Sequence, residues 1–312
     1  MGGDIDEPRD VHGRRKGTEA ITWFHKNPAL SNQYCLYCAR LVGAGSQLFS
    51  DKEHLIARRM VPPDGFSDPA AFNFLFRACR NCNKEKADLE DHISAVTLLT
   101  SPGRADEAVD AAARRKAANS FDPRQKGKPI GEVRNTTTVK MGGIFTFELV
   151  SAAQLDRDKV RLLALRHIQG LFALTTSEDP RASETSKVLP PRHFGFLGHY
   201  PHRDWGNPQL LEVVRRAGSL PQIAAITTAN GYFRCVLRRE DPIGSPWFWA
   251  LEWNKSVRLA GWIGDPQAPP PIFADLPDAG WQVTQHEGGG FTRFRRETPL
   301  GDEADLLFDL AD

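Results

Sequence analysis

The sequence has little of several features that would indicate its class directly. It has only five cysteines in 312 residues, too few for the disulfide framework of a secreted domain. No apolar run approaches the roughly 18–20 residues that a membrane span requires, and the N-terminal stretch MGGDIDEPRDVHGRRKG has no apolar signal core. We therefore expect a cytoplasmic protein that crosses no membrane and begins with a disordered arm over residues 1–17.

Net charge is also nearly absent. The 40 Lys and Arg against 39 Asp and Glu leave +1, which alone argues neither for nor against nucleic acid. The distribution is less even, because residues 111–140 hold eight basic and two acidic residues. A block of this kind can follow a phosphate backbone, and it is equally typical of a solvated helix end and a linker.

The length and the change of pattern along the chain predict two domains. Residues 18–105 hold both cysteine pairs, with helices expected over 19–30 and 84–99. Residues 106–135 combine most of an alanine-rich helix, expected over 104–118, with a basic linker.

Residues 136–312 are predicted to form a second domain of α+β class, with an antiparallel sheet of about four strands. The Asn230-Gly231 step between two β-rich runs is a strong hairpin signature. The other expected elements are helices over 157–174 and 207–218, a strand pair over 137–150, a loop over 177–194, and strands over 246–254 and 257–264. The whole chain is thus expected to be α+β.

Four of the five cysteines form two Cys-x-x-Cys pairs, Cys35 with Cys38 and Cys79 with Cys82. Four thiolates in a tetrahedron make a closed structural zinc site. The forty residues between the pairs exceed the spacing of a simple ribbon, so a further element is inserted there. Buried thiols without a metal are the alternative, and the paired pattern favours zinc.

Residues in and after this insert can carry acid–base and metal-ion chemistry. His54 can take a proton from water near neutral pH, and the adjacent Glu53 can bind a hard divalent cation such as Mg²⁺. Asn83 follows the last cysteine, and Lys86 lies one helical turn further on. Neighbours on a regular strand point to opposite faces, so Glu53 and His54 would need a bent segment to reach one point.

Residues of about 30–92 resemble the HNH endonuclease family, in the form braced by four cysteines, through the ordered elements CLYC, EHLI, Asn73 and CRNCNKEK. The resemblance implies a ββα metal finger with a structural Zn²⁺ and a catalytic Mg²⁺ or Mn²⁺. It implies that His54 is the general base and that Asn73 orients it through its backbone. It further implies that Glu53 and Asn83 bind the catalytic metal and that Lys86 contacts phosphate.

The resemblance leads us to expect an endonuclease, a hydrolase that cuts phosphodiester bonds in DNA. A zinc-stabilised nucleic-acid-binding protein without cleavage is the alternative. His54 separates the two, because a binding module needs no base there. Residues 136–312 would recognise substrate or a protein partner, and a third possibility gives this domain the main role as a protein-binding module.

Several residues also have simpler interpretations. Asn83 is a favourable N-cap for the helix that follows. His199 and His202 have a spacing found in metal sites, but without a nearby cysteine a pair of loop residues is favoured. Cys235 is predicted to be a small buried residue of a strand.

Tryptophan is concentrated in one part of the chain, since five of the seven lie between residues 205 and 262. Trp247, Trp249 and Trp253 alternate onto one strand face. This is usually a core pattern, and an aromatic face of this kind can also stack bases.

Overall fold

The computed structural model describes residues 32, 34–43, 45–68, 71–122, 125, 127–141, 145–151, 153–176, 194–240, 246–285 and 291–309. The expected arm over 1–17, the helix over 19–30 and nearly all of the loop over 177–194 lie outside these residues. Within the described part of the chain, no helix is both long and apolar enough to cross a membrane. The chain is mixed α and β with antiparallel sheets, as expected.

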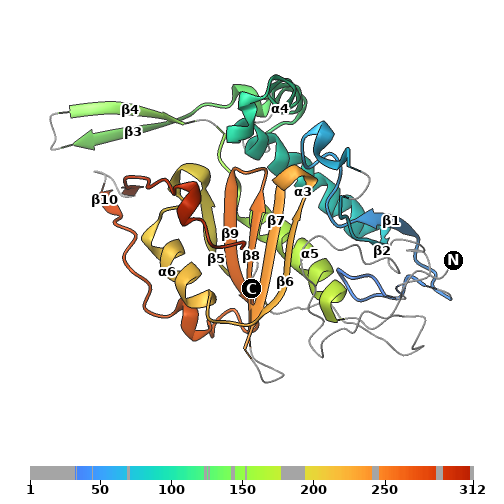
Figure 1. The fold of residues 1–312 in the computed structure, drawn as a ribbon. Coiled ribbons are helices and arrows are strands. Elements are labelled where there is room, and N and C mark those ends of the chain that lie inside the picture. The colour runs from blue at the N-terminus through green and yellow to red at the C-terminus, as the bar shows by residue number, and fades with distance from the viewer. Residues whose placement is uncertain are drawn as a thin grey trace.

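A five-stranded antiparallel sheet lies at the centre of the molecule, in the order β5–β9–β8–β7–β6 (Figure 1). Its strands are β5 Phe194–Pro201, β6 Gln222–Thr228, β7 Phe233–Arg239, β8 Trp247–Trp253 and β9 Val257–Ile263. Strand β5 adds to the four that were expected, and it places His199 in a strand rather than a loop. The glycines that hide β5 in the sequence have a packing reason, because a Cβ at Gly195 would lie 1.9 Å from the Trp262 ring.

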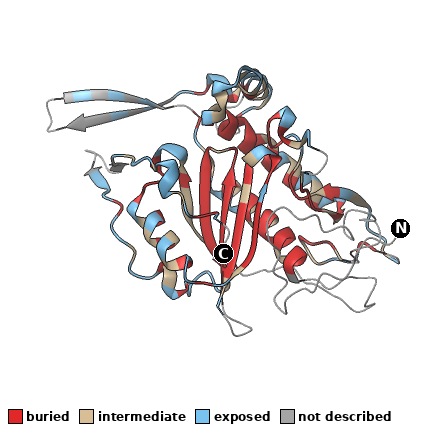
Figure 2. Ribbon diagram, in the orientation of Figure 1, coloured by how far each residue is buried: buried red, intermediate tan, exposed pale blue. Residues whose placement is uncertain are grey.

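Both faces of the sheet are buried, and the strands are red along most of their length in Figure 2. Trp249 and Trp253 belong to one core and Phe248 to the other, as the alternation of side chains along β8 requires. The core interpretation of the tryptophans is therefore confirmed, and neither Trp249 nor Trp253 has exposed surface for stacking a base. Cys235 is a buried core residue of β7, also as predicted.

One helix covers each face of the sheet. Helix α5, Arg157–Thr176, packs on the face that carries Trp249, and α6, Pro208–Ala217, packs on the other. Both match the predicted helices. Helix α6 begins where Asn207 accepts a hydrogen bond from the Gln209 backbone N–H at 2.9 Å, a typical N-cap.

The cysteine-rich part forms a ββα unit. Strands β1 (Ser50–His54) and β2 (Leu75–Cys79) pair antiparallel, and α3 (Arg80–Leu99) follows β2 without a loop. We call this unit, with the loop around Cys35, the finger. Helix α3 begins earlier than the predicted 84. Helix α4, Glu107–Asn119, packs on α3 and begins at Asp106, whose carboxylate accepts from two backbone N–H groups.

The finger and the central sheet share one hydrophobic core. A single cluster of buried side chains includes Leu55 and Phe74 of the finger together with Phe233 and Trp253 of the sheet. Polar contacts also cross between them, for example from Thr228 Oγ1 to the Phe72 carbonyl oxygen at 2.6 Å. Side chains from both sides of the expected boundary between residues 135 and 136 therefore pack in the same core.

The remaining strands form two hairpins, β3 (Asn135–Met141) with β4 (Phe145–Ser151) and β10 (Gln282–Gln285) with β11 (Phe291–Phe294). The first was predicted and projects from the body of the molecule (Figure 1). The Asn230-Gly231 hairpin is also confirmed, and its turn has positive φ angles of 54° and 78° at these two residues. Described 3₁₀ helices cover Pro63–Phe66, Pro102–Ala105, Ile130–Glu132, His202–Asp204, Ala229–Gly231, Pro271–Phe273 and Asp302–Ala304.

Candidate functional site

The four paired cysteines converge. The Sγ atoms of Cys35, Cys38, Cys79 and Cys82 all lie within 4.8 Å of one another, and those of Cys38 and Cys79 are 3.7 Å apart. A tetrahedral ion with metal–sulfur bonds of about 2.3 Å has sulfur–sulfur edges of about 3.8 Å. The cluster can therefore hold a metal ion and is consistent with structural zinc. Within the described residues, no other group of three or more His, Cys, Asp or Glu is arranged to do so.

The cluster joins two pieces of chain that are distant in sequence. Cys35 and Cys38 lie on a tight turn closed by the hydrogen bond from the Ala39 N–H to the Cys35 carbonyl oxygen at 2.9 Å. Cys79 ends β2, and Cys82 lies in the first turn of α3, where the helix dipole favours a thiolate. The hydrogen bond between Cys35 and Cys82 lowers the pKa of the Cys35 thiol and raises that of Cys82, so the pair favours a thiolate at Cys35.

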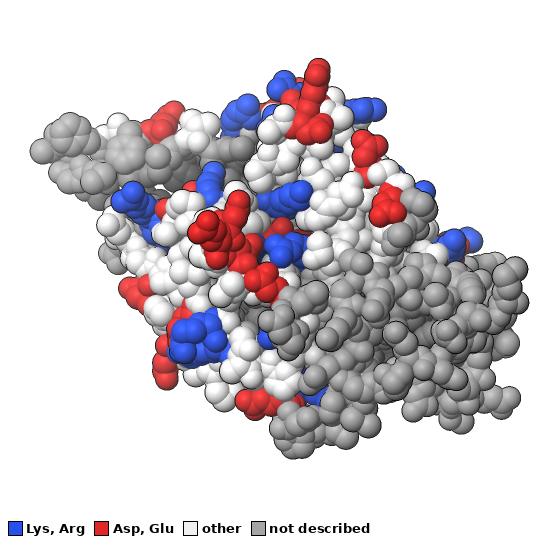
Figure 3. Space-filling model, viewed as in Figure 1, with Lys and Arg blue, Asp and Glu red and all other residues white. Residues whose placement is uncertain are grey.

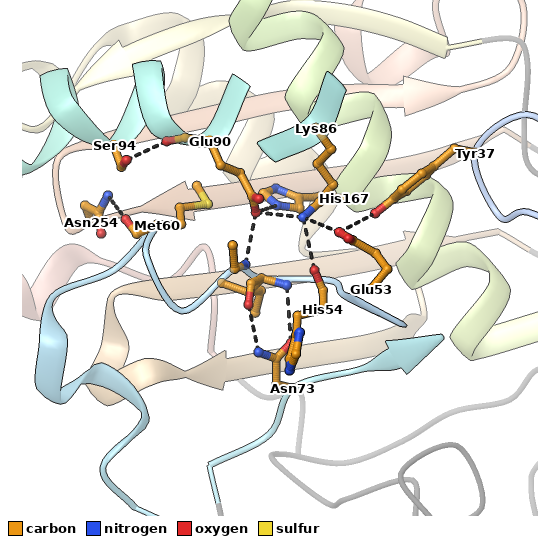
Figure 4. A network of polar contacts seen from close by, with 12 residues as sticks. Tyr37, Glu53, His54, Met60, Asn73, Lys86, Glu90, Ser94, His167 and Asn254 are labelled. Atoms are coloured by element: carbon orange, nitrogen blue, oxygen red, sulfur yellow. Dashed lines mark hydrogen bonds and ion pairs between the residues drawn. The ribbon is translucent and has the colours of Figure 1, made fainter. Parts of the chain in front are cut away.

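A buried ion-pair network surrounds Lys86 (Figure 4), one turn after Cys82 on α3. The Lys86 ammonium is 2.8 Å from Glu53 Oε1 and 2.7 Å from Glu90 Oε1, and it donates to the His54 carbonyl oxygen at 3.1 Å. Lys86 is 0 % exposed. The predicted contact of Lys86 with phosphate is therefore wrong, because all three donors of its ammonium are directed to partners inside the protein.

Glu90 was not singled out in the sequence, although it lies four residues after Lys86 on the same helix face. Its Oε1 also accepts from the Ala57 N–H at 3.0 Å and lies 3.6 Å from His167 Nε2 on α5. Burial alone would raise the pKa of Glu90, but Lys86 and His167 outweigh it and hold this pKa below its usual value. Burial also lowers the pKa of His167 to about 4, so this imidazole is neutral near pH 7.

The network has an excess of carboxylate. Burial raises the pKa of Glu53, against the opposing charge of Lys86. Tyr37 donates its hydroxyl to Glu53 Oε1 at 3.2 Å. With both carboxylates ionised and His167 neutral, Glu53 and Glu90 outnumber the single ammonium by one charge. A buried excess of this kind is stabilised by a proton or by a nearby cation.

His54 lies on the opposite side of β1 from Glu53. In Figure 4 the Glu53 carboxylate points toward Lys86 and Tyr37, whereas the His54 ring lies beside Asn73. The β1–β2 register is regular through His54, which is paired with Leu75, so the bent segment expected at this point is not found. The structure therefore does not bring the two side chains to one point.

The His54 ring is half-buried and makes no hydrogen bond with any described residue. Burial lowers its pKa, and the positive charges of Lys52, Arg58 and Lys86 lower it further. The imidazole is therefore neutral near pH 7 and has a nitrogen lone pair available, as a general base requires.

Asn73 clamps the chain just after His54. Its Oδ1 accepts from the Ile56 N–H at 3.2 Å, and its Nδ2 donates to the Ile56 carbonyl oxygen at 2.7 Å. Both backbone groups of one residue are thereby fixed by a single buried amide. The amide acts two residues beyond His54, on the turn that ends β1.

Asn83 lies inside α3 rather than at its start. The N-cap of this helix is Cys79, without a side-chain cap bond, so the capping interpretation of Asn83 is wrong. Its side chain is half-exposed and forms no hydrogen bond with the described residues. Asn83 lies three positions before Lys86 on the same helix face. Its half-exposed amide can therefore reach a ligand from solvent.

Cations gather near His54. Lys52 shares its face of β1, and Arg77 is directly opposite Lys52 in the β1–β2 register. By contrast, Figure 3 shows acidic and basic side chains interspersed over the described surface of one face of the molecule. The basic block over 111–140 is spread along α4 and β3, and Arg114 and Lys116 in it already pair with acidic side chains.

No protein family, curated protein or solved structure matches this chain. The site is therefore defined by its own geometry.

Replacing Lys86 by alanine is expected to lower the free energy of unfolding by about 3–5 kcal/mol, because it leaves two carboxylates buried without their cation. Lys84 is exposed on the same helix, and Lys84→Ala is expected to change this free energy by no more than about 0.5 kcal/mol. Urea unfolding of both variants measures the difference. Equal losses in the two would show that the buried pairs contribute nothing.

Proposed function

We propose that this protein is a metal-dependent endonuclease of the HNH type, with a structural Zn²⁺ in the four-cysteine cluster. The observation that carries the proposal is the placement of His54. His54 is the last residue of the first strand of a ββα unit, and its imidazole is neutral and makes no hydrogen bond with the described residues. Asn73 holds the backbone of the turn that follows. A base that is fixed in position and unprotonated at neutral pH is what activation of a water molecule requires.

The proposed catalytic cation is Mg²⁺ or Mn²⁺, and hard cations of this kind prefer carboxylate and amide oxygens. Of the two predicted ligands, Asn83 is half-exposed and keeps this role in the proposal. Glu53 does not, because its buried carboxylate is paired with Lys86 on the side of β1 opposite His54. When bound, such a cation neutralises charge on the leaving oxygen of a phosphodiester.

The proposed substrate is DNA, whose backbone would lie across the face of β1 that carries His54. Lys52 on this face, with Arg58 close by in the chain, offers positive charge on the side from which a phosphate would reach the base. The Arg77 guanidinium opposite Lys52 donates to the Val42 carbonyl oxygen at 2.8 Å. The network around Lys86 lies behind this surface and supports the strand.

Cleavage of supercoiled plasmid in Mg²⁺ or Mn²⁺ tests the proposal. His54→Ala is expected to reduce the cleavage rate by at least about a hundredfold, the usual contribution of a general base. The matched control is His202→Ala, since His202 is exposed and lies outside the finger; it is expected to cut like the wild type. Zinc content is measured for all three proteins, so that loss of activity is separated from loss of the finger.

Equal cleavage by the wild type and His54→Ala would refute the assignment of the base. If neither protein cuts, but both hold zinc and shift DNA in a gel, the protein is a zinc-stabilised nucleic-acid-binding module instead.

A further inference from the structure

Helix α5 lies against the residues that follow His54, although more than a hundred positions separate the two in the sequence. Gly170 of α5 faces Leu55, and a Cβ added at Gly170 would lie 2.4 Å from Leu55 Cδ1. Leu55 is fully buried, so its side chain has little space into which it could move. One turn earlier on the same helix, His167 Nε2 lies 3.6 Å from Glu90 Oε1.

Within the finger, the backbone of residues 54–57 is already fixed by hydrogen bonds. Phe74 accepts the Leu55 N–H at 2.8 Å through its carbonyl oxygen, and Glu90 accepts the Ala57 N–H at 3.0 Å. Helix α5 adds contacts from outside the finger, because Gly170 packs against Leu55 and His167 lies beside the Glu90 carboxylate.

The same helix face holds the cysteine-bearing loop. Gln169 Nε2 donates to the Tyr37 carbonyl oxygen at 3.2 Å, and the Arg166 guanidinium lies over the Tyr37 ring at 5.2 Å from its centroid. Arg166 also bonds to Glu85 on α3 at 2.5 Å. Helix α5 therefore contacts the loop, the turn after β1 and α3, which are three of the pieces that make up the finger.

We propose that α5 is a positioning element of the His54 site, acting through Gly170 against Leu55 and through His167 against Glu90. The positioned group is the base assigned above, so the catalytic part of this inference rests on the proposed function. It follows that the segment after residue 136 supplies part of the nuclease site itself, in addition to any recognition of substrate.

The test uses a clash and its relief in the full-length protein. Gly170→Ala introduces a methyl group against Leu55, and Leu55→Val with Gly170→Ala removes a carbon from one side while adding one to the other. Alanine is otherwise favoured over glycine inside a helix. A lower kcat or a moved His54 signal in Gly170→Ala would therefore be due to the clash with Leu55 and not to a weaker helix. Leu55→Val alone and Arg161→Ala, at an exposed position of α5, are the controls.

The first readout is the NMR signal of the His54 ring Cε1–H at one fixed pH, assigned by its loss in His54→Gln. The second is plasmid cleavage, resolved into kcat and KM, with zinc content measured alongside. We expect Gly170→Ala to move the His54 signal and to lower kcat at least tenfold, with KM and zinc content within twofold of wild type. The double variant is expected to restore both readouts, and Arg161→Ala to change neither.

A His54 signal that stays at its wild-type position in Gly170→Ala would overturn the positioning role. If the signal moves and returns in the double variant while no protein cuts DNA, α5 does position His54 and the nuclease proposal has failed instead. Should Gly170→Ala fail to fold, His167→Gln carries the same two readouts, and an unchanged His54 signal there would likewise overturn the inference.

Discussion

Stripping the metal from the four-cysteine cluster is expected to unfold the finger and to destabilise the core that it shares with the central sheet. The cluster ties the loop around Cys35 to the junction of β2 and α3, two pieces of chain that are distant in sequence. Binding of structural zinc contributes about 10–16 kcal/mol in small zinc domains, as much as the whole stability of a typical protein, about 5–15 kcal/mol. Dialysis against a strong chelator, followed by thermal unfolding monitored by circular dichroism, measures the effect.

The matched pair for this experiment is Cys82→Ser and Cys235→Ala. Both cysteines are buried, but only Cys82 belongs to the cluster. We expect Cys82→Ser to lose the metal and most of its cooperative unfolding, whereas Cys235→Ala keeps a full complement of metal and a single transition. A Cys82→Ser protein that melts at the temperature of the wild type would show that the cluster does not stabilise the fold.

Residues 136–312 are expected not to form a stable domain when expressed alone. In the complete chain, Leu163 of α5, Phe233 and Trp253 are buried in one cluster with Leu55 and Phe74 of the finger. Without the finger these side chains lose much of their cover, and each apolar side chain returned to water costs about 1.5–3 kcal/mol. A few such losses exceed the stability of most domains. Near-ultraviolet circular dichroism and limited proteolysis of the fragment test this.

The control supplies the missing part as a second chain. Residues 1–135 expressed together with 136–312 are expected to restore fixed tertiary structure, because the cover of the shared core returns. A fragment 136–312 that unfolds cooperatively on its own, with an intact near-ultraviolet spectrum, would contradict the shared core. It would also favour an independent protein-binding role for this part of the chain.

Most elements of the fold could be predicted from local patterns. Helices α5 and α6, the Asn230-Gly231 hairpin and the alternating tryptophans of β8 all follow from periodicities of 3.6 or 2 and from turn residues. Strand β5 could not, because Gly195 and Gly198 are poor strand formers. The Trp262 ring, which comes from β9, is the reason that Gly195 is needed there.

The candidate site divides in the same way. The two cysteine pairs were recognised from spacing alone, and the structure brings all four sulfur atoms together. The phosphate contact predicted for Lys86 is not found, because the fold places this lysine between Glu53 and Glu90, where most lysines one turn after a motif would be solvated. His167 had no local signal, since its contact with Glu90 joins segments that are far apart in the chain.

Residue type and short spacing were enough to single out the four thiols that converge and the histidine that we propose as the base. The surroundings of these residues follow from the folded chain alone: Lys86 is an internal counter-ion, Glu53 and His54 face opposite sides of β1, and Gly170 of α5 packs against Leu55. Burial and long-range packing set the pKa of a side chain and what it can contact, and neither is encoded in the residues next to it.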